Sequence, residues 1–363
     1  MKKLLCAMIA LLLLCTGCEY KDIDRRIFVV AIGIDQGERE GNFKVSLKLA
    51  LPQGDVSKID EKMQILTEES TSISEALRRM KSRVEKELDY VHCKSLVLGE
   101  GLAAKDIRHV LDWAIRRRDI QLILNFAIGR PGALEVLEIK PPSERIPSNS
   151  LIVAMSGQGT ESPFITSVYA FELVNRVYEQ GVDPVLPVIE AKGKDQFLID
   201  KVAVLDKSKV SLVLTADETR LFNLLTRQDL RTNLPARVQE GKVQYYTETS
   251  SSSYQIIMRQ GEPVIRYNIK IKGIIEENST LTEVNHRMLK EVSSSGGEEL
   301  RASVEALLIK VQQSGLDPFG WGLHYCARHW NNESELEEWE RMVPRIRFEV
   351  MPKVEVKYSG MIE

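Results

Sequence analysis

The sequence predicts an α+β protein of several domains, in which helices pack on mixed sheets and a signal peptide precedes the folded part. Two patterns support this fold class. Apolar runs typical of strands are interspersed with segments in which apolar residues recur every three or four positions. The chain has 363 residues, a length that corresponds to about two to three domains of ordinary size.

The first part of the chain mixes strands and helices. An apolar run at residues 27–35 and an alternating run at 43–51 predict a hairpin of two strands. Both predicted helices show apolar stripes, and the first also carries basic residues on the opposite side. The elements follow the order strand, strand, helix, strand, helix, strand, at residues 27–35, 43–51, 72–88, 93–98, 103–118 and 120–128. This order predicts a mixed sheet with helices packed on it.

Proline-rich and glycine-containing segments divide the rest of the chain. Prolines at 141, 142 and 147 break the pattern, and a helix is predicted from Pro163 to about residue 180. Residues 191–194 are expected to form a linker. We therefore expect an N-terminal α/β domain at 27–139, a middle region at 140–194 and a C-terminal α+β domain at 195–363.

The C-terminal domain is expected to contain long elements. Two long strands are predicted at residues 242–258 and 264–275, and the second of these alternates clearly between apolar and polar side chains. A short helix at 218–225 precedes them, and a long helix at 281–311, weakened around 293–297, follows. A last pair of strands is expected within residues 345–358.

The first eighteen residues indicate export and lipid attachment. Two lysines are followed by eleven apolar residues at 4–14, which is too short to span a bilayer and is typical of a signal peptide. The run ends in a segment similar to the lipobox of bacterial lipoproteins, although Cys15 stands where leucine is usual. We therefore expect residues 1–17 to be removed after Gly17, Cys18 to carry the lipid with its acyl chains such as palmitate, and residues 18–26 to act as a tether.

Composition narrows the classes of function. There are 49 basic and 52 acidic residues, a balance that argues against a protein that coats nucleic acid. Five cysteines and five histidines provide little material for a disulfide framework or a metal enzyme. We expect no metal, no cofactor and no catalytic residues, and the group formed by His324, Cys326 and His329 lacks the spacing of a metal site.

Four features together resemble the Ger(x)C family, the C subunits of spore germinant receptors. They are the lipobox cysteine Cys18, the early strand that ends in Ala31-Ile32-Gly33-Ile34-Asp35, the segment Gly315-Leu316-Asp317-Pro318-Phe319-Gly320-Trp321-Gly322, and the residues that follow it, which are His329, Trp330, Trp339, Val354, Val356 and Gly360. The resemblance covers nearly the whole mature chain. The chain departs from the family at Glu19 and Tyr20, where Trp and Asp often stand.

The resemblance implies a receptor subunit without catalytic activity. Such a subunit is anchored to the outer face of the spore's inner membrane, has an α+β ectodomain of three domains, and assembles with the integral membrane A and B subunits. It is required for spore germination in response to nutrients. The alternative is a lipid-anchored solute-binding protein that delivers a small ligand to a membrane permease. A cell-wall hydrolase has no positive support in the sequence.

The loop that contains Asp317, Phe319 and Trp321 is the candidate for partner contact. Its proline and glycines set a turn, and its aromatic side chains offer a large apolar area. Two interpretations remain open at this point: a contact surface for a partner subunit, or an internal cluster that packs the long helix onto the last sheet. Asp35, at the end of its strand, is expected to act as a capping residue.

Overall fold

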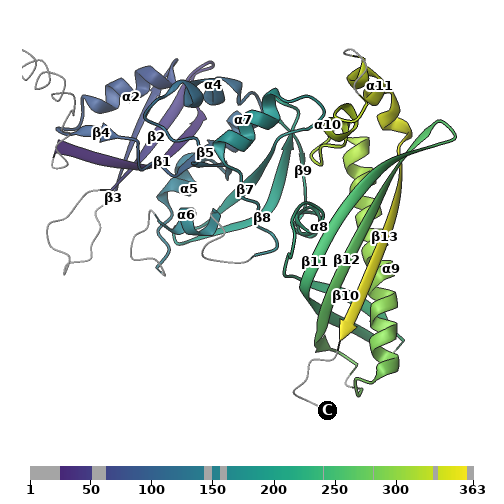
Figure 1. The fold of residues 1–363 in the computed structure, drawn as a ribbon. Helices are drawn as coiled ribbons and strands as arrows, with labels where there is room; N and C mark the ends of the chain where they lie inside the picture. Colours follow the sequence, from purple (N-terminus) through teal and green to yellow (C-terminus); the bar gives the residue numbers. More distant parts are fainter. Residues whose placement is uncertain are drawn as a thin grey trace, which may run out of the picture.

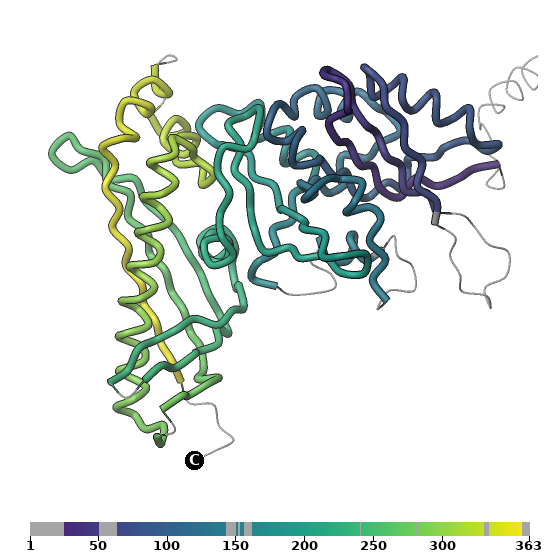
Figure 2. The backbone as a smooth tube through the Cα atoms, turned by 180° about the vertical axis from the view of Figure 1, so that it is seen from behind, coloured from purple at the N-terminus to yellow at the C-terminus, as the bar shows by residue number. Residues whose placement is uncertain are grey.

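The computed structural model describes residues 25–50, 63–142, 149–155, 162–239, 241–280, 282–329 and 334–357. The predicted signal peptide 1–17, with Gly17, lies outside the described residues, as do Cys18 and most of the tether. The chain forms two sheets, each with its own helices, and they stand side by side (Figures 1 and 2). Helices and mixed sheets together confirm the α+β class.

The first sheet has nine strands in the order β3-β2-β1-β5-β6-β7-β8-β9, with β4 beside the start of β1. The predicted hairpin is present as the antiparallel pair β1–β2, and β1, β5, β6 and β7 are parallel neighbours. The strands are β1 (Arg26–Gln36), β2 (Phe43–Ala50), β3 (Met63–Ser70), β4 (Glu87–Asp89), β5 (Ser95–Gly99), β6 (Asn125–Arg130), β7 (Val185–Lys192), β8 (Gln196–Leu205) and β9 (Val210–Val213).

Helices cover both faces of this sheet, because alternate side chains of its strands are buried on opposite sides. Ile32 and Ile34 of β1 belong to one buried cluster, together with side chains of α2 (Ile73–Lys81), α4 (Arg108–Arg116) and α7 (Ala170–Tyr178). On the other face, Ala31 belongs to a second cluster with α5 (Ala133–Glu138) and α6 (Asn149–Met155). The short helix α3 (Glu100–Ala103) follows β5.

The early sequence motif at the end of β1 places α5 on the sheet. Asp35 accepts hydrogen bonds from the backbone N–H groups of Ala133 (2.7 Å) and Leu134 (3.0 Å) in the first turn of α5. A carboxylate in this position binds the free N–H groups at a helix start and interacts favourably with the helix dipole. Asp35 is therefore a capping residue, as expected, but for a helix 98 residues further along the chain.

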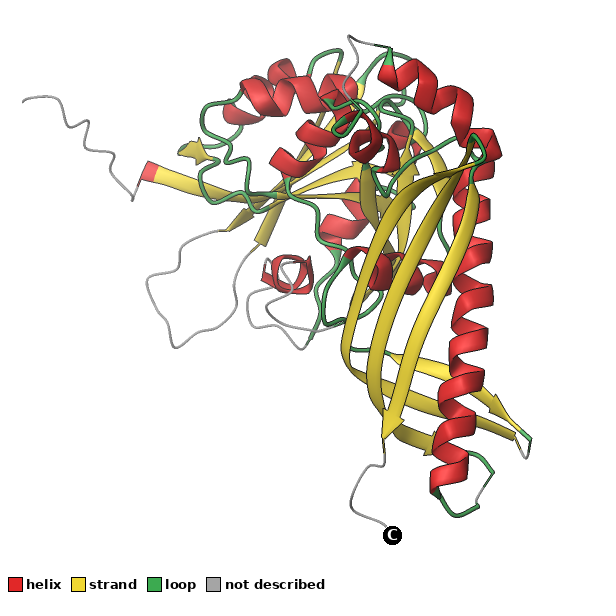
Figure 3. Cartoon of the chain, turned by 45° about the vertical axis from the view of Figure 1, so that its right-hand side comes forward, coloured by secondary structure: helices red, strands yellow, loops and turns green. Residues whose placement is uncertain are grey.

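The second sheet has four strands in the order β10-β11-β12-β13. They are β10 (Asn233–Val238), β11 (Gly241–Arg259), β12 (Glu262–Asn278) and β13 (Arg347–Lys357). The long helix α9 (His286–Gln313) runs along this sheet (Figure 3). The predicted weakening at residues 293–297 does not interrupt the helix, and Gly296 there lets the ring of Tyr245 pack directly beneath α9.

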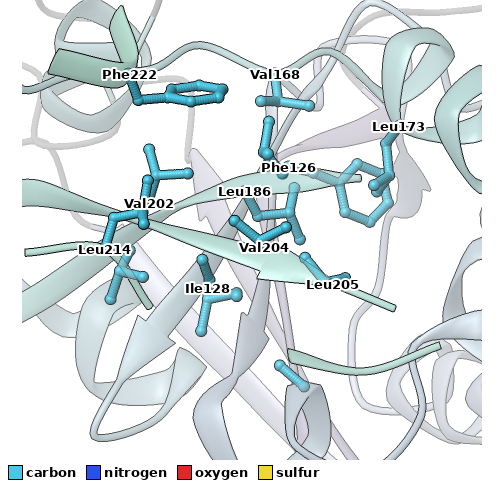
Figure 4. Close-up of a cluster of buried hydrophobic side chains, with 14 of the residues drawn as sticks. Phe126, Ile128, Val168, Leu173, Leu186, Val202, Val204, Leu205, Leu214 and Phe222 are labelled. Carbon is cyan, nitrogen blue, oxygen red and sulfur yellow. The ribbon is translucent and has the colours of Figure 1, made fainter. Parts of the chain in front are cut away.

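Helix α8 (Ala216–Thr226) joins the two sheets. Its Phe222 lies in a buried cluster with Phe126 and Val202 of the first sheet (Figure 4). The hydroxyl of Thr219 accepts a hydrogen bond from the backbone N–H of Val202 (3.0 Å), and Asn223 accepts one from the hydroxyl of Thr166 (2.8 Å). One continuous buried cluster therefore extends from the first sheet into the second.

Several predicted boundaries are wrong for physical reasons. Helix α2 ends at Lys81 rather than 88, because Leu88 lies in β4 beside β1 instead of extending the helical stripe. Helix α7 begins at Ala170 rather than at Pro163, whose carbonyl accepts a hydrogen bond from Asn223. The predicted strand pair near the C-terminus is the single strand β13, which pairs with β12 in parallel.

The expected linker at residues 191–194 is instead the end of β7 and the start of the turn of a hairpin. β7 and β8 pair in antiparallel register from Val185 and Val204 to Lys192 and Gln196. The first sheet therefore runs across the expected boundary at residue 194, and its strands come from all three expected regions. In the part of the chain that the structure describes, no helix is both long and apolar enough to cross a membrane.

The capping contact of Asp35 gives the first prediction. Replacement Asp35→Ala removes a half-buried acceptor from two backbone N–H groups, so we expect the free energy of unfolding to fall by about 1–3 kcal/mol. Urea unfolding of the purified chain measures this change. Asp195→Ala, at an exposed position in the β7–β8 turn, is the control and should change stability little. Equal stability of the two variants would contradict the capping role.

Candidate functional site

The loop at residues 315–322, called the junction loop below, lies where the two sheets meet. It follows α9, includes the first two residues of the short helix α10 (Trp321–Cys326), and faces the end of α7. The backbone N–H of Asp183 donates to the carbonyl of Asp317 (2.7 Å), and the N–H of Asp317 donates to the carboxylate of Asp183 (2.6 Å). The N–H of Leu323 donates to the carbonyl of Gly181 (2.7 Å). Main-chain hydrogen bonds therefore join segments far apart in the sequence.

Two glycines permit this close approach of backbones. Gly181 has a φ of +73°, and a Cβ there would overlap the backbone of Gly322 and Leu323. A Cβ at Gly322 would lie 2.7 Å from the indole nitrogen of Trp339 in α11 (Glu335–Met342). No other residue type fits at Gly181 without strain, because both its φ and its surroundings exclude a side chain.

The carboxylate of Asp317 is buried inside the junction loop. Its Oδ2 accepts a hydrogen bond from the backbone N–H of Gly322 (2.7 Å), whereas its Oδ1 is buried without a hydrogen-bond partner among the described residues. Burial raises the pKa of Asp317 to about 6, since removal from water disfavours the charged form, although the backbone N–H groups oppose this shift. Burial also raises the pKa of Asp183.

Two cations bind the carbonyl groups around the junction loop. Arg176 donates to the carbonyls of Asp183 (2.9 Å) and Pro318 (3.0 Å). Lys207 donates to carbonyls at the end of α7 and just beyond it, those of Arg176 (2.5 Å), Glu179 (2.6 Å) and Val182. Cations in this position satisfy free carbonyls and complement the negative end of the helix dipole. Burial lowers the pKa of both side chains.

The aromatic side chains of the junction loop point into the protein. Trp321 is only 1% exposed, and its indole N–H donates to the hydroxyl of Tyr267 on β12 (2.7 Å). Phe319 stacks on Trp321 with ring centroids 5.1 Å apart and lies 5.3 Å from Phe222 of α8. The structure therefore corrects the interpretation of Trp321 as a partner-contact residue: its side chain already packs the loop against the last sheet and α8.

A small cleft of about 260 Å³ adjoins the junction loop. Its lining includes Asp183 and Lys207 on one side and Asp317, Trp321 and Trp339 on the other. Two polar groups of this lining are already engaged, because Lys207 binds three carbonyls and Asp183 accepts the N–H of Asp317, whereas Oδ1 of Asp317 has no hydrogen-bond partner among the described residues. The cleft therefore has few polar groups that are free to bind a ligand.

The remaining sequence candidates do not come together as a reactive site. His324 and Cys326 lie on α10 and not on a strand, and His329 follows that helix. Among the residues that the structure describes, no cluster of His, Cys, Asp or Glu has the geometry to hold a metal ion. Cys93 is buried and Cys326 is half-buried, and both are free thiols.

Comparison with known proteins assigns the chain to a protein family. Residues 19–191 match the family described as spore germination protein N-terminal domain, and residues 200–360 match the family described as spore germination B3/GerAC like, C-terminal. The chain belongs to the Ger(x)C family of spore germination proteins. The division between the two family domains falls in the β7–β8 hairpin, so β9 and most of β8 belong by sequence to the C-terminal domain but pair in the first sheet.

Individual relatives show the same full-length similarity. The chain is 22% identical to the putative spore germination protein YfkR of Bacillus subtilis strain 168 over 387 residues, covering 100% of this chain and 98% of the relative. It is 21% identical to spore germination protein KC of the same organism, covering 99% and 97%. It is 22% identical to spore germination protein GerQC of Bacillus cereus, covering 96% of each.

A solved structure shares the fold. The crystal structure of the GerBC protein matches with a TM-score of 0.56 and 17% identity, over 90% of this chain and 98% of that chain. The two chains therefore share a fold. Sequence reasoning identified the loop side of the junction and missed Arg176, Gly181, Asp183 and Lys207. The one local sequence feature that could have indicated these residues is the turn sequence Gly-Val-Asp-Pro at 181–184.

Gly181 provides a direct test of the junction. Gly181→Ala places a Cβ against the backbone of residues 322–323, so we expect it to lower the free energy of unfolding by roughly 2 kcal/mol more than a turn glycine without such contact. Gly193→Ala is the matched control, because Gly193 has a φ of +75° and a Cβ there would make only an ordinary van der Waals contact, with Oδ1 of Asp195 at 3.6 Å. Urea unfolding compares the two variants, and equal losses would show that the close approach is unimportant.

Asp317 predicts a dependence of stability on pH. Because the folded-state pKa of about 6 exceeds the ordinary value of 3.8, the folded protein holds the proton more tightly than the unfolded chain. The contribution of Asp317 to stability is therefore greatest below pH 4 and falls as the pH rises to 6, by up to about 3 kcal/mol. In Asp317→Asn, stability should fall less as the pH rises. Part of the decline should remain, because the pKa of Asp183 is raised as well.

The test is urea unfolding of the wild-type chain and Asp317→Asn from pH 4 to pH 7. Asp217→Asn is the control, since Asp217 is 79% exposed and pairs only with Arg220 at the surface. An unchanged slope in Asp317→Asn would contradict the assignment of a buried, proton-binding carboxylate.

Proposed function

We propose that this chain is the C subunit of a nutrient germinant receptor and that it acts without catalysis. The observation that carries the proposal is the match of both family domains, in order, over nearly the whole chain. The named relatives are spore germination proteins and are covered almost completely. The partners in this proposal are the integral membrane A and B subunits.

The proposed location is the outer face of the spore's inner membrane. The apolar run, Gly17 and Cys18 support lipid attachment after removal of the signal peptide. Two or more acyl chains on one cysteine give stable anchoring, because each buried CH₂ contributes about 0.8 kcal/mol. The folded domains then remain outside the membrane and next to the membrane subunits.

The geometry of the junction suits an assembly role better than solute delivery. A solute-binding protein needs a cleft whose walls provide free polar groups to its ligand. Here the space between the two sheets is filled by Phe319, Trp321 and Phe222, and the backbones of 181–183 and 317–323 are hydrogen-bonded to each other. These contacts support a rigid body that holds or couples membrane partners.

The proposal is tested with spores of four strains: wild type, a deletion of the gene, Cys18→Ala and Cys326→Ala. We expect the deletion to abolish the release of dipicolinic acid in response to one class of nutrient. Cys18→Ala should lose the same response and should leave the membrane fraction, since it lacks the anchor. Cys326→Ala should respond normally.

Co-purification from spore membranes completes the test. The wild-type chain should be recovered with A and B subunits after detergent extraction. A deletion strain with every nutrient response intact, together with a chain that recovers no membrane partner, would refute the receptor role.

A further inference from the structure

The amino-terminal edge of the first sheet combines the start of the folded chain with two exposed loops. β1 begins at Arg26, and β5 and β6 are parallel to β1, so all three strands start toward the same edge. The loop at 90–94 leads into β5, and the loop at 117–124 leads into β6. The tether that leads to Cys18 therefore leaves the folded domain from this edge.

Large apolar side chains are exposed along this edge. Val91 is 44% exposed, Leu122 40%, Ile123 55%, and Phe171 at the start of α7 42%. Backbone hydrogen bonds show that their segments are neighbours, since the N–H of Asn125 donates to the carbonyl of Lys94 (2.8 Å), and the N–H of Phe171 donates to that of Leu122 (3.1 Å). Exposed apolar groups that gather on one edge indicate a contact surface.

The same edge carries basic side chains. Lys94 lies in the first loop, and Arg116, Arg117 and Arg118 lie at the end of α4 and the start of the second loop. Arg116 pairs with Asp112 and Arg117 with Asp119, whereas Arg118 is exposed and forms no ion pair within the described ranges. Arg117 also lies over the ring of Tyr90 at 4.6 Å. Basic, aromatic and aliphatic side chains together are typical of surfaces that bind the boundary of a lipid bilayer.

We propose that this edge rests on an anionic lipid bilayer, with Val91, Leu122, Ile123 and Phe171 entering the boundary between head groups and acyl chains. The inference rests on the proposed lipid attachment at Cys18. Seven peptide steps separate Cys18 from Arg25, and they span at most about 25 Å when fully extended. A lipid at Cys18 therefore keeps this edge close to the membrane, which favours the bilayer over a protein as the occupant.

The test uses the mature full-length chain with its lipid, in a Cys326→Ser background, reconstituted without other proteins. An environment-sensitive fluorophore is attached at Ile123→Cys, and independently at Phe171→Cys. Met258→Cys is the matched control, because Met258 is 46% exposed on β11 of the other sheet. The vesicles contain phosphatidylcholine with and without phosphatidylglycerol, and quenching by doxyl-labelled lipid measures contact with the bilayer.

We expect labels at positions 123 and 171 to shift to shorter emission wavelength and to be quenched on the order of twofold more than the label at 258. Phosphatidylglycerol should increase this difference. If the chain floats with the vesicles and all three labels are quenched equally, the membrane-contact edge is refuted while the lipid anchor stands. If the chain does not float with the vesicles, the anchor itself is refuted and the inference falls with it.

Discussion

The hydrogen bonds between residues 181–183 and the junction loop are the constraint on which the arrangement of the two sheets depends. They need the two main chains to touch, which Gly181 permits because it has no side chain and adopts a positive φ. Once the loop is held there, Trp321 reaches Tyr267 on β12, and Phe319 reaches Phe222 on α8. The polar junction thus directs the aromatic packing that unites the cores.

Two sequence motifs on which the family resemblance rests have the same structural role, which is to supply a carboxylate that accepts hydrogen bonds at the start of a helix. Asp35 accepts hydrogen bonds from the first turn of α5, and Asp317 accepts one from Gly322 in the first turn of α10. In each case a carboxylate satisfies N–H groups that a helix start leaves unpaired. Gly33, two residues before Asp35, allows Ala133 to lie against β1. Both motifs therefore report how the fold is assembled, and neither by itself marks a reactive or binding group.

The sequence predicted those helices and strands that are buried on one side, because such burial produces a regular pattern of apolar residues. β2 and β12 were predicted because their side chains alternate between apolar and polar, and β1 was predicted from a continuous apolar run. α2 was predicted too long because Val84 and Leu88 continue its spacing although they lie beyond its end. The junction was beyond sequence reasoning since its partners are distant: Arg176 and Pro318, which are hydrogen-bonded, are 142 residues apart.

The two edges of the first sheet differ in a way that bears on function. Open sheets of parallel strands usually bind small molecules at the carboxyl ends of their strands. Here that edge is filled by the chain itself, because Asp35 occupies the space where Gly99 has no side chain and binds the start of α5. At the opposite edge, where β1 begins, the side chains of Val91, Leu122, Ile123 and Phe171 are exposed. In the proposed receptor subunit, the edge at the strand starts rather than the closed edge would therefore be the one that faces the membrane.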